Sequence, residues 1–262
     1  MKIADLRIYP VKSCRGMSVE RATVRERGFA SDRRAMIVSE GGRFLSQRSH
    51  SKLAQIVPNP SNGMSLTIGE KPIAVSFTNE RKRVGVWADE VSAALATDSV
   101  NAALSEFLGE PVYLVSMDSE SHRQTDAAFG DPRQVSFADG FPYLITTTAS
   151  LAALSETAGD MIPMERFRPN IVIETDTPWL EDEWTTLEIE GQRFDLVKPC
   201  TRCVITTLDQ NTGEKVGQST MQALVKTRAR SGAWGRGVVF GINAIAVNPG
   251  SELRKGMSVA TT

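Results

Sequence analysis

The stretch KPCTRCVITTLDQ, residues 198–210, places two thiols three positions apart and follows them with a run of β-branched residues. Such residues are enriched in strands, so the run predicts a strand directly after Cys203. Pro199 restricts the backbone that enters the pair. Arg202 is adjacent to Cys203, and a neighbouring guanidinium favours the thiolate form of a cysteine. Because a thiolate is a soft ligand for a soft or redox-active metal, the stretch indicates a metal- or cofactor-binding turn between two strands.

Three other interpretations of the cysteine pair remain open. A structural zinc site takes four ligands, whereas the sequence holds no second CxxC or CxxH pair. A thioredoxin-type redox pair normally opens a helix, which disagrees with the strand predicted after Cys203. Two inert buried thiols are the third interpretation, because free cysteine often packs as a small hydrophobic residue.

Further strands are predicted on both sides of this stretch. Alternating or β-branched runs bounded by Gly, Pro and Ser predict strands in KIADLRIYPV (2–11), RATVRERGF (21–29), PYLITT (142–147), NIVIET (170–175), TTLEIEGQRFDLV (185–197) and VVFGINAIAV (238–247). Two hairpins are predicted, with turns at Gly41-Gly42 and at residues 69–72. Helical spacing marks 98–109, 148–159 and 220–232. This density of strands predicts an α+β fold that is mostly β, with barrel-like sheets.

One polar segment with little periodicity divides the chain. MDSESHRQTDAAFGDPRQ, residues 117–134, carries Gly and Pro and lacks an apolar pattern. We therefore predict a smaller N-terminal β domain over residues 1–118 and a larger β-barrel domain over residues 119–262.

The composition is that of an ordinary globular protein. The 262 residues are 41% hydrophobic and 23% charged, and the formal net charge of −1 predicts neither a nucleic-acid nor a membrane partner. The sequence holds no apolar run long enough to span a bilayer, and its N-terminus lacks the apolar core of a signal peptide. Three cysteines are too few for a disulfide framework, so we predict a cytoplasmic protein. With only two histidines, any catalysis is expected to rely on a cofactor.

Two other motifs gather groups suited to an anionic ligand. RFRPNIVI, residues 166–173, sets two guanidiniums and an amide at the start of an apolar strand, where ligand-binding groups are common. YPVKSCRG, residues 9–16, offers Lys12, Ser13 and Arg15, and more positive charge follows at residues 32–34 and at Arg48. Each motif alone is more typical of a solvated surface than of a ligand site. Together they indicate an anionic ligand.

The order and spacing of these motifs resemble the MOSC family, named for the C-terminal domain of molybdenum cofactor sulfurases. The resemblance is strongest to the branch that contains the mitochondrial amidoxime-reducing component and its bacterial relatives. It covers nearly the whole chain and rests on IYPVKSCRG (8–16), SDRRAMIV (31–38), FLSQR (44–48), FPYLITT (141–147), RFRPNIVI (166–173), KPCTRCVITTLDQNTG (198–213) and VVFGINAIAVNPG (238–250). It implies a MOSC N-terminal β domain followed by a MOSC β-barrel domain.

The resemblance also implies a molybdenum–molybdopterin cofactor and a role for individual residues. Cys203 matches the molybdenum ligand and is the implied catalytic residue, whereas Cys200 matches a cysteine that does not bind the metal. The implied cofactor-binding residues are Lys12, Ser13, Arg33, Arg168, Asn170, Thr201, Arg202 and Cys203. Arg48 and Ser150 are expected nearby.

The function implied by this branch is reduction of small N-hydroxylated substrates. A cofactor carrier or sulfur-handling module without turnover is the alternative, and a domain that has lost its cofactor is a third. The sulfurases join this domain to a pyridoxal-phosphate domain, for which the chain has no room. The sequence holds no GxGxxG fingerprint and too few cysteines for a four-cysteine cluster, so electrons are expected from a separate ferredoxin-like, flavodoxin-like or cytochrome-type protein with its reductase. Residues 226–236 are a predicted basic docking surface for that protein.

Some bacterial relatives of this branch carry a fused ferredoxin domain, which this protein is expected to lack. The chain departs from the family pattern at two further places. Residues 49–52, SHSK, stand where relatives often have a Pro-Arg pair, so this wall of the site is expected to differ. Ile242 and Asn243 stand in a stretch that is more aromatic in the animal proteins, so the substrate mouth is expected to differ as well.

Overall fold

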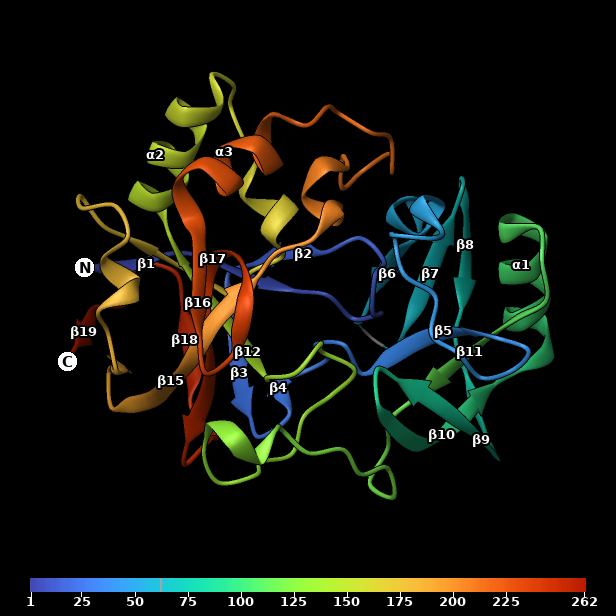
Figure 1. Ribbon diagram of the computed structural model, residues 1–262. Coiled ribbons are helices and arrows are strands. Elements are labelled where there is room, and N and C mark those ends of the chain that lie inside the picture. Colours follow the sequence, from blue (N-terminus) through green and yellow to red (C-terminus); the bar gives the residue numbers. More distant parts are fainter. Residues whose placement is uncertain (62) are drawn as a thin grey trace.

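The computed structural model describes residues 1–61 and 63–262, and most of its regular structure is β (Figure 1). The described residues form 19 strands and three α-helices, α1 (Asp98–Leu108), α2 (Thr148–Ala158) and α3 (Ser219–Arg228). Figure 1 shows two parts: one with both chain termini, α2 and α3, and one with α1. The predicted mostly-β, α+β class is confirmed.

The larger part is built on a nine-stranded sheet. Its strands are β1 (Lys2–Ile8), β2 (Met17–Val19), β12 (Tyr143–Thr147), β13 (Ile171–Glu174), β14 (Thr186–Ile189), β15 (Gln192–Thr201), β16 (Ala229–Gly232), β17 (Gly235–Val247) and β19 (Val259–Thr261). They pair in the order β19-β14-β15-β17-β12-β13-β1-β2, with β16 on the free part of β17. The β12–β13 pair is parallel, and the other strand pairs of this sheet are antiparallel.

The ladders of this sheet do not close into a barrel in the described part of the chain. The pairing follows an open path from β19 to β2. An isolated bridge between Lys2 and Ser258 and backbone hydrogen bonds, such as that from Ile3 to the carbonyl of Met257 at 2.9 Å, link β1 to the segment before β19. The chain that leaves β2 enters β3 (Arg21–Arg25), which pairs with β18 (Glu252–Arg254) and β4 (Gly28–Phe29) in a separate three-stranded sheet. The described residues therefore have the predicted β-rich MOSC architecture, and their two sheets form no closed barrel.

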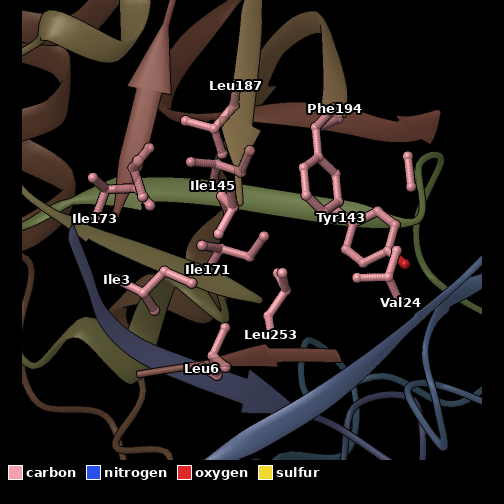
Figure 2. Close-up of a cluster of buried hydrophobic side chains, with 14 of the residues drawn as sticks. Ile3, Leu6, Val24, Tyr143, Ile145, Ile171, Ile173, Leu187, Phe194 and Leu253 are labelled. Atoms are coloured by element: carbon pink, nitrogen blue, oxygen red, sulfur yellow. The ribbon is translucent and has the colours of Figure 1, made fainter. Parts of the chain in front are cut away.

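Alternating apolar residues of these sheets face one buried core, which Figure 2 shows in close-up. The rings of Tyr143, Phe29 and Phe194 meet edge to face there, with centroids 5.1 Å apart in each pair with Tyr143. Ile3 and Leu6 of β1 lie in the same core as Ile171 of β13. The first strand of the chain is thus packed into the sheet formed mostly by residues after 142.

The smaller part contains two sheets and α1. A four-stranded antiparallel sheet has the order β5 (Ala35–Ser39), β11 (Val112–Ser116), β10 (Asp89–Ala96) and β9 (Phe77–Val86). A three-stranded sheet joins β6 (Val57–Asn59), β7 (Ser65–Ile68) and β8 (Lys71–Ala74). Because strands on both sides of residue 118 pair with one another in the larger part, the two parts are interleaved along the sequence, and the exact boundary at 118 stays a prediction.

The hairpins turn and two of the helices end at the glycines predicted from the sequence. β7 and β8 form the hairpin with its turn at Gly69, and β5 returns through Gly41-Gly42 to a bridge between Val38 and Phe44. Gly109 and Gly159 end α1 and α2 in the left-handed conformation, with φ of 81° and 66°, which glycine adopts without a side-chain clash. The third predicted helix ends four residues early, because residues 229–232 pair with β17 as β16. In the described residues no helix combines the length and apolar composition needed to cross a membrane.

Candidate functional site

A cleft between the two parts gathers the eight residues that the family resemblance implied for cofactor binding. The volume open to the centre of a water molecule is about 120 Å³. The total empty volume, which includes the open mouth, is about 860 Å³. The eight predicted residues that line it are Lys12, Ser13, Arg33, Arg168, Asn170, Thr201, Arg202 and Cys203. Phe44, Ser46, Arg48, Asp139, Phe141, Leu144, Phe167, Cys200 and Asn243 also line it. Residues more than 180 positions apart thus meet at one wall.

The cysteine turn forms where β15 leaves the large sheet. Register shifts between Leu196 and Lys198, and again between Pro199 and Thr201, turn the strand end away from β17. The strand predicted after Cys203 is wrong: residues 204–207 form a short 3-10 helix. The hydroxyls of Thr206 and Thr207 explain the difference, because they donate to the carbonyls of Cys203 at 3.0 Å and Val204 at 2.7 Å and so satisfy the tight turn locally.

The two cysteines of the turn differ in their contacts. Arg202 donates through Nη1 to Sγ of Cys200 at 2.8 Å and through Nη2 to the carbonyl of Phe167 at 2.7 Å. Its guanidinium therefore contacts Cys200, not the adjacent Cys203 as the sequence suggested. Cys203 is half-buried, lines the cleft and has no side-chain hydrogen bond to any described residue, which leaves its sulfur free for a ligand. Such asymmetry agrees with one metal-binding thiol and one structural thiol.

Cys14, the third cysteine, is separate from this pair. It lies in the core of the smaller part with no exposed surface. Burial raises the pKa of its thiol to about 12, so it remains protonated at neutral pH. We therefore exclude it as a metal ligand.

Tyr9 holds two cleft arginines at a fixed separation. Its buried ring lies 4.3 Å from Cζ of both Arg33 and Arg168, and its hydroxyl donates to the carbonyl of Pro169 at 3.0 Å. Burial, and then the charge of Arg33, lower the pKa of Arg168 to about 10, so the guanidinium stays charged at neutral pH. An aromatic face attracts cations, so the ring offsets part of the repulsion between the two guanidiniums.

The backbone is strained at three residues of the same cleft wall. Ser13, Arg33 and Arg168 have φ of 65°, 47° and 55°, in the left-handed region that costs a residue with a side chain about 1–2 kcal/mol. Surrounding hydrogen bonds hold the strain: Arg33 donates to Asp32 at 2.6 Å and to Oδ1 of Asn170 at 3.0 Å. Such strain concentrates at functional sites, where it aims side chains that relaxed backbone would point elsewhere.

Gly16 allows the Tyr9 ring to occupy this position. A Cβ on Gly16 would lie 2.2 Å from Cε1 of Tyr9, a distance that the packed structure cannot accept. We expect Gly16→Ala to displace the ring, lower the free energy of unfolding by about 1–3 kcal/mol and loosen the Arg33–Arg168 pair. Urea denaturation measures the stability. Gly41→Ala, where a Cβ meets nothing within 4 Å, is the matched control, and an unchanged midpoint for Gly16→Ala would contradict the close contact.

Lys12 and Asp139 form an ion pair at the mouth. The nearly buried Lys12 ammonium donates to Oδ1 of Asp139 at 2.5 Å and to the carbonyl of Phe137 at 2.8 Å. Desolvation raises the Asp139 pKa, but the charges of Lys12, Arg33 and Arg48 lower it by more. Because this carboxyl is 78% exposed to the solvent of the mouth, the neighbouring cations dominate, and its pKa lies well below the usual range. Asp139 is therefore an anion at neutral pH and a poor proton donor.

The cleft carries a surplus of positive charge with unused donors. Five cations and one carboxylate line it, and the remaining polar lining is neutral. Nη2 of Arg168 and Nε of Arg202 are buried and have no hydrogen-bond partner among the described residues. Buried donors without partners cost about 1–3 kcal/mol each, so their presence indicates a ligand that accepts from them. The residues present therefore fit an anionic, acceptor-rich group such as a pterin phosphate.

The Asn170 side chain positions its neighbours, because its polar atoms are already engaged in hydrogen bonds within the protein. Its Oδ1 accepts from Arg33 at 3.0 Å and from the backbone nitrogen of Leu144 at 3.2 Å, and its Nδ2 donates to the carbonyl of Arg7 at 3.2 Å. These bonds tie β1, β12 and the start of β13 together and aim Arg33 into the cleft. Asn243, at the expected substrate mouth, lines the cleft opposite them.

Three expectations about neighbouring residues need correction. Ser150 does not lie in the cleft: it is buried, donating to Glu181 at 2.8 Å and accepting from the backbone of Trp179. Arg166 points to Thr220 of α3 at 3.1 Å instead of joining Arg168 in the cleft. Arg228 is 1% exposed, because it forms a two-bond ion pair with Asp182 at 2.7 Å, so the predicted basic surface loses its central charge.

Sequence reasoning missed Tyr9, Asp139 and Trp87 as parts of the site. Trp87 stacks on Arg48 at 4.5 Å and donates to Asp139 at 3.3 Å, with a left-handed φ of 58°. The usable signal was that Tyr9 belongs to the same motif, residues 9–16, as Lys12. Asp139 and Trp87 stand in stretches without any recognisable pattern.

Comparison with known proteins agrees with this geometry. Residues 1–111 match the MOSC N-terminal beta barrel domain and residues 132–260 match the MOSC domain. The chain is 28% identical to human mitochondrial amidoxime-reducing component 1 over 269 residues, which covers 95% of this chain and 80% of that protein. It is 29% identical to human molybdenum cofactor sulfurase and 30% identical to the Danio rerio sulfurase, covering 86% and 92% of this chain.

The relatives differ in how much of their length the chain spans. It covers only 28% of the human sulfurase and 31% of the Danio rerio sulfurase, against four fifths of the human amidoxime-reducing component. The two domain matches together account for nearly the whole chain. This chain therefore belongs to the MOSC family and is related to proteins of molybdenum cofactor chemistry.

Proposed function

We propose that the protein binds a molybdenum–molybdopterin cofactor in the cleft and reduces small N-hydroxylated substrates with electrons from a separate protein. One observation carries the proposal. The Cys203 thiol, which has no hydrogen-bond partner among the described residues, lies in a cleft that has more cationic side chains than carboxylates and also holds buried donors without partners. A single protein thiolate beside an open mouth suits a metal that must also contact substrate. Its relatives include a protein named for amidoxime reduction, which supports this reaction class.

The residues of the cleft divide the work of binding. Cys203 would supply the sulfur ligand, while Arg168 and Arg202 would donate to the anionic parts of the cofactor. Arg33 is aimed by Asn170 and Asp32, and Lys12 is held at the mouth by Asp139. When bound, the cofactor supplies the two-electron change that converts an N–OH group, with two protons, to N–H and water. Because Asp139 is ionised, those protons are expected to arrive from solvent through the open mouth.

The electron source provides the direct test. The sequence holds no dinucleotide-binding fingerprint, so we expect no turnover of benzamidoxime with NADH or NADPH alone. Reduced methyl viologen, or an added carrier with its reductase, is expected to restore turnover in protein produced in a cofactor-competent host. Benzamidine formation is measured by chromatography. Rapid reduction with the nicotinamide alone would contradict the need for a partner, and inactivity with every donor despite bound molybdenum would overturn the reductase assignment.

A cofactor-carrying or sulfur-handling module is the second candidate. The sulfurases favour it, because their identity to this chain is as high as that of the amidoxime-reducing component. A carrier would hold the cofactor and transfer it without reducing substrate. Transfer of radiolabelled molybdenum to an apo-acceptor enzyme, together with inactivity toward benzamidoxime, is the result that would support it.

A further inference from the structure

A second hollow opens beside the cofactor cleft, and it is lined partly by residues of the FLSQR (44–48) and KPCTRCVITTLDQNTG (198–213) motifs. This side pocket lies between residues 47–51 of the smaller part and residues 204–218 of the larger part, with a volume of about 300 Å³. The backbones meet closely at its edge, because a Cβ on Gly213 would lie 2.2 Å from the carbonyl oxygen of Ser51. Gln55 Nε2 also donates to the carbonyl of Thr212 at 2.7 Å. Two packed segments thus fix its walls.

The side pocket adjoins the cleft around Cys203. Arg48 lines both, and Val204, the residue after Cys203, lines the side pocket with 54% of its surface exposed. Ile205 and Thr206 face the cleft, whereas Thr207 and Leu208 face the side pocket. The short helix of residues 204–207 therefore lies between the two hollows, and both hollows border Arg48.

The charge of the side pocket is purely positive. Arg48 and Lys215 line it, and no carboxylate does so among the described residues. Neither cation forms an ion pair with a described carboxylate; Arg48 stacks on Trp87 instead. The position of Lys215 is set by its backbone, because Leu208 and Lys215 form a bridge and Asp209 donates to the carbonyl of Glu214 at 2.9 Å. An unpaired cation on a fixed backbone is suited to an anionic group of a ligand.

The remaining lining offers a place for an apolar ring. Val204 and Leu208 form an apolar wall. The buried Gln47 donates through Nε2 to the carbonyl of Ser13 at 2.9 Å, while its Oε1 has no partner among the described residues. An apolar wall with a few polar groups is the usual composition of a small-molecule site.

We propose that the side pocket is a substrate subsite that selects N-hydroxylated aromatic or heterocyclic compounds carrying a carboxylate or phosphate. This inference rests on the proposed function, because it assigns the N–OH end to the Cys203 cleft. The ring lies on Val204 and Leu208, and the anion pairs with Lys215 and Arg48. Lys215 and Arg48 are thereby specificity residues, not catalytic residues.

The test compares an anionic with a neutral substrate in matched variants. The probes are 4-carboxybenzamidoxime and benzamidoxime, with reduced methyl viologen as donor. In Lys215→Gln we expect the KM of the carboxylate compound to rise about tenfold and its kcat to stay constant, while the KM of benzamidoxime changes less than about twofold. Lys215→Arg is expected to restore most of the preference. Lys71→Gln, an exposed lysine on β8 outside the pocket, is the control for general surface charge.

A binding measurement separates this inference from the proposed function. Isothermal titration of the oxidised protein with 4-carboxybenzamidoxime is expected to show the same tenfold loss in Lys215→Gln without any turnover. If benzamidoxime is not reduced at all, the proposed function fails while the titration still decides the subsite. Equal effects on both probes, or the same effect in Lys71→Gln, would overturn the subsite. Release of a nucleotide-bearing pterin from the wild-type protein but not from Lys215→Gln would assign the pocket to the cofactor and also overturn it.

Discussion

Replacing Cys203 with serine is expected to remove bound molybdenum and lower substrate reduction by more than about 100-fold. A serine hydroxyl is a poor ligand for a soft metal, and even residues that only support a metal ligand change affinity by about 10–100-fold. The cleft offers no replacement, since Cys200 is engaged by Arg202 and Cys14 is buried as a thiol. Molybdenum content by plasma mass spectrometry and benzamidoxime turnover are the two measurements.

Cys200→Ser is the matched control for this experiment. The substitution removes only the contact with Arg202, whose guanidinium keeps its bond to the carbonyl of Phe167. We therefore expect bound metal and a reduced but substantial rate. An equal loss of metal from both variants would point to a paired-cysteine site, and the assignment of Cys203 as sole protein ligand would fall.

Replacing Arg168 with alanine is expected to give a folded protein that retains much less pterin. The side chain offers an unpartnered buried Nη2 and is held only by Gln210 at 3.1 Å and the Tyr9 ring. A charge-assisted contact contributes about 1.5–3 kcal/mol, which corresponds to about a 10–100-fold weaker hold on the cofactor. Pterin released by acid and oxidised to its fluorescent form measures the content per protein.

Lys12→Ala is also expected to lower pterin retention. It additionally leaves the Asp139 carboxylate without its ion-pair partner. The substitution frees Asp139, whose carboxylate would then repel an anionic ligand at the mouth. The double variant Lys12→Ala with Asp139→Asn should therefore recover part of the retention that Lys12→Ala loses. Arg193→Ala, which changes an exposed arginine paired with Asp195, is the control. Full pterin content in both Arg168→Ala and Lys12→Ala would show that neither side chain holds the cofactor.

Local chemistry explains which elements were predictable. Gly109 and Gly159 end helices, and Gly41-Gly42 and Gly69 turn hairpins, because these positions depend on the backbone freedom of one or two residues. The alternation in residues 185–197 likewise predicts β14 and β15 from neighbouring residues alone. The strand predicted at residues 204–207 failed for a local reason as well, since threonine hydroxyls stabilised a turn that β-branched composition disfavours.

The sequence by itself determined the mostly β class and the MOSC family, and eight residues that the resemblance implied lie among those lining the cleft; their roles, the residue-118 boundary and a cytoplasmic location stay predictions. Only the tertiary structure decided that Tyr9 lies between Arg33 and Arg168, that Asp139 pairs with Lys12, and that a second pocket adjoins Cys203. The reason is the separation of the partners along the chain. The contacts of Arg33 with Asn170 and of Lys12 with Asp139 join residues 137 and 127 positions apart, and no local pattern specifies them. Such contacts arise when β1 enters the sheet beside β13 and carries the N-terminal motif to the cysteine turn.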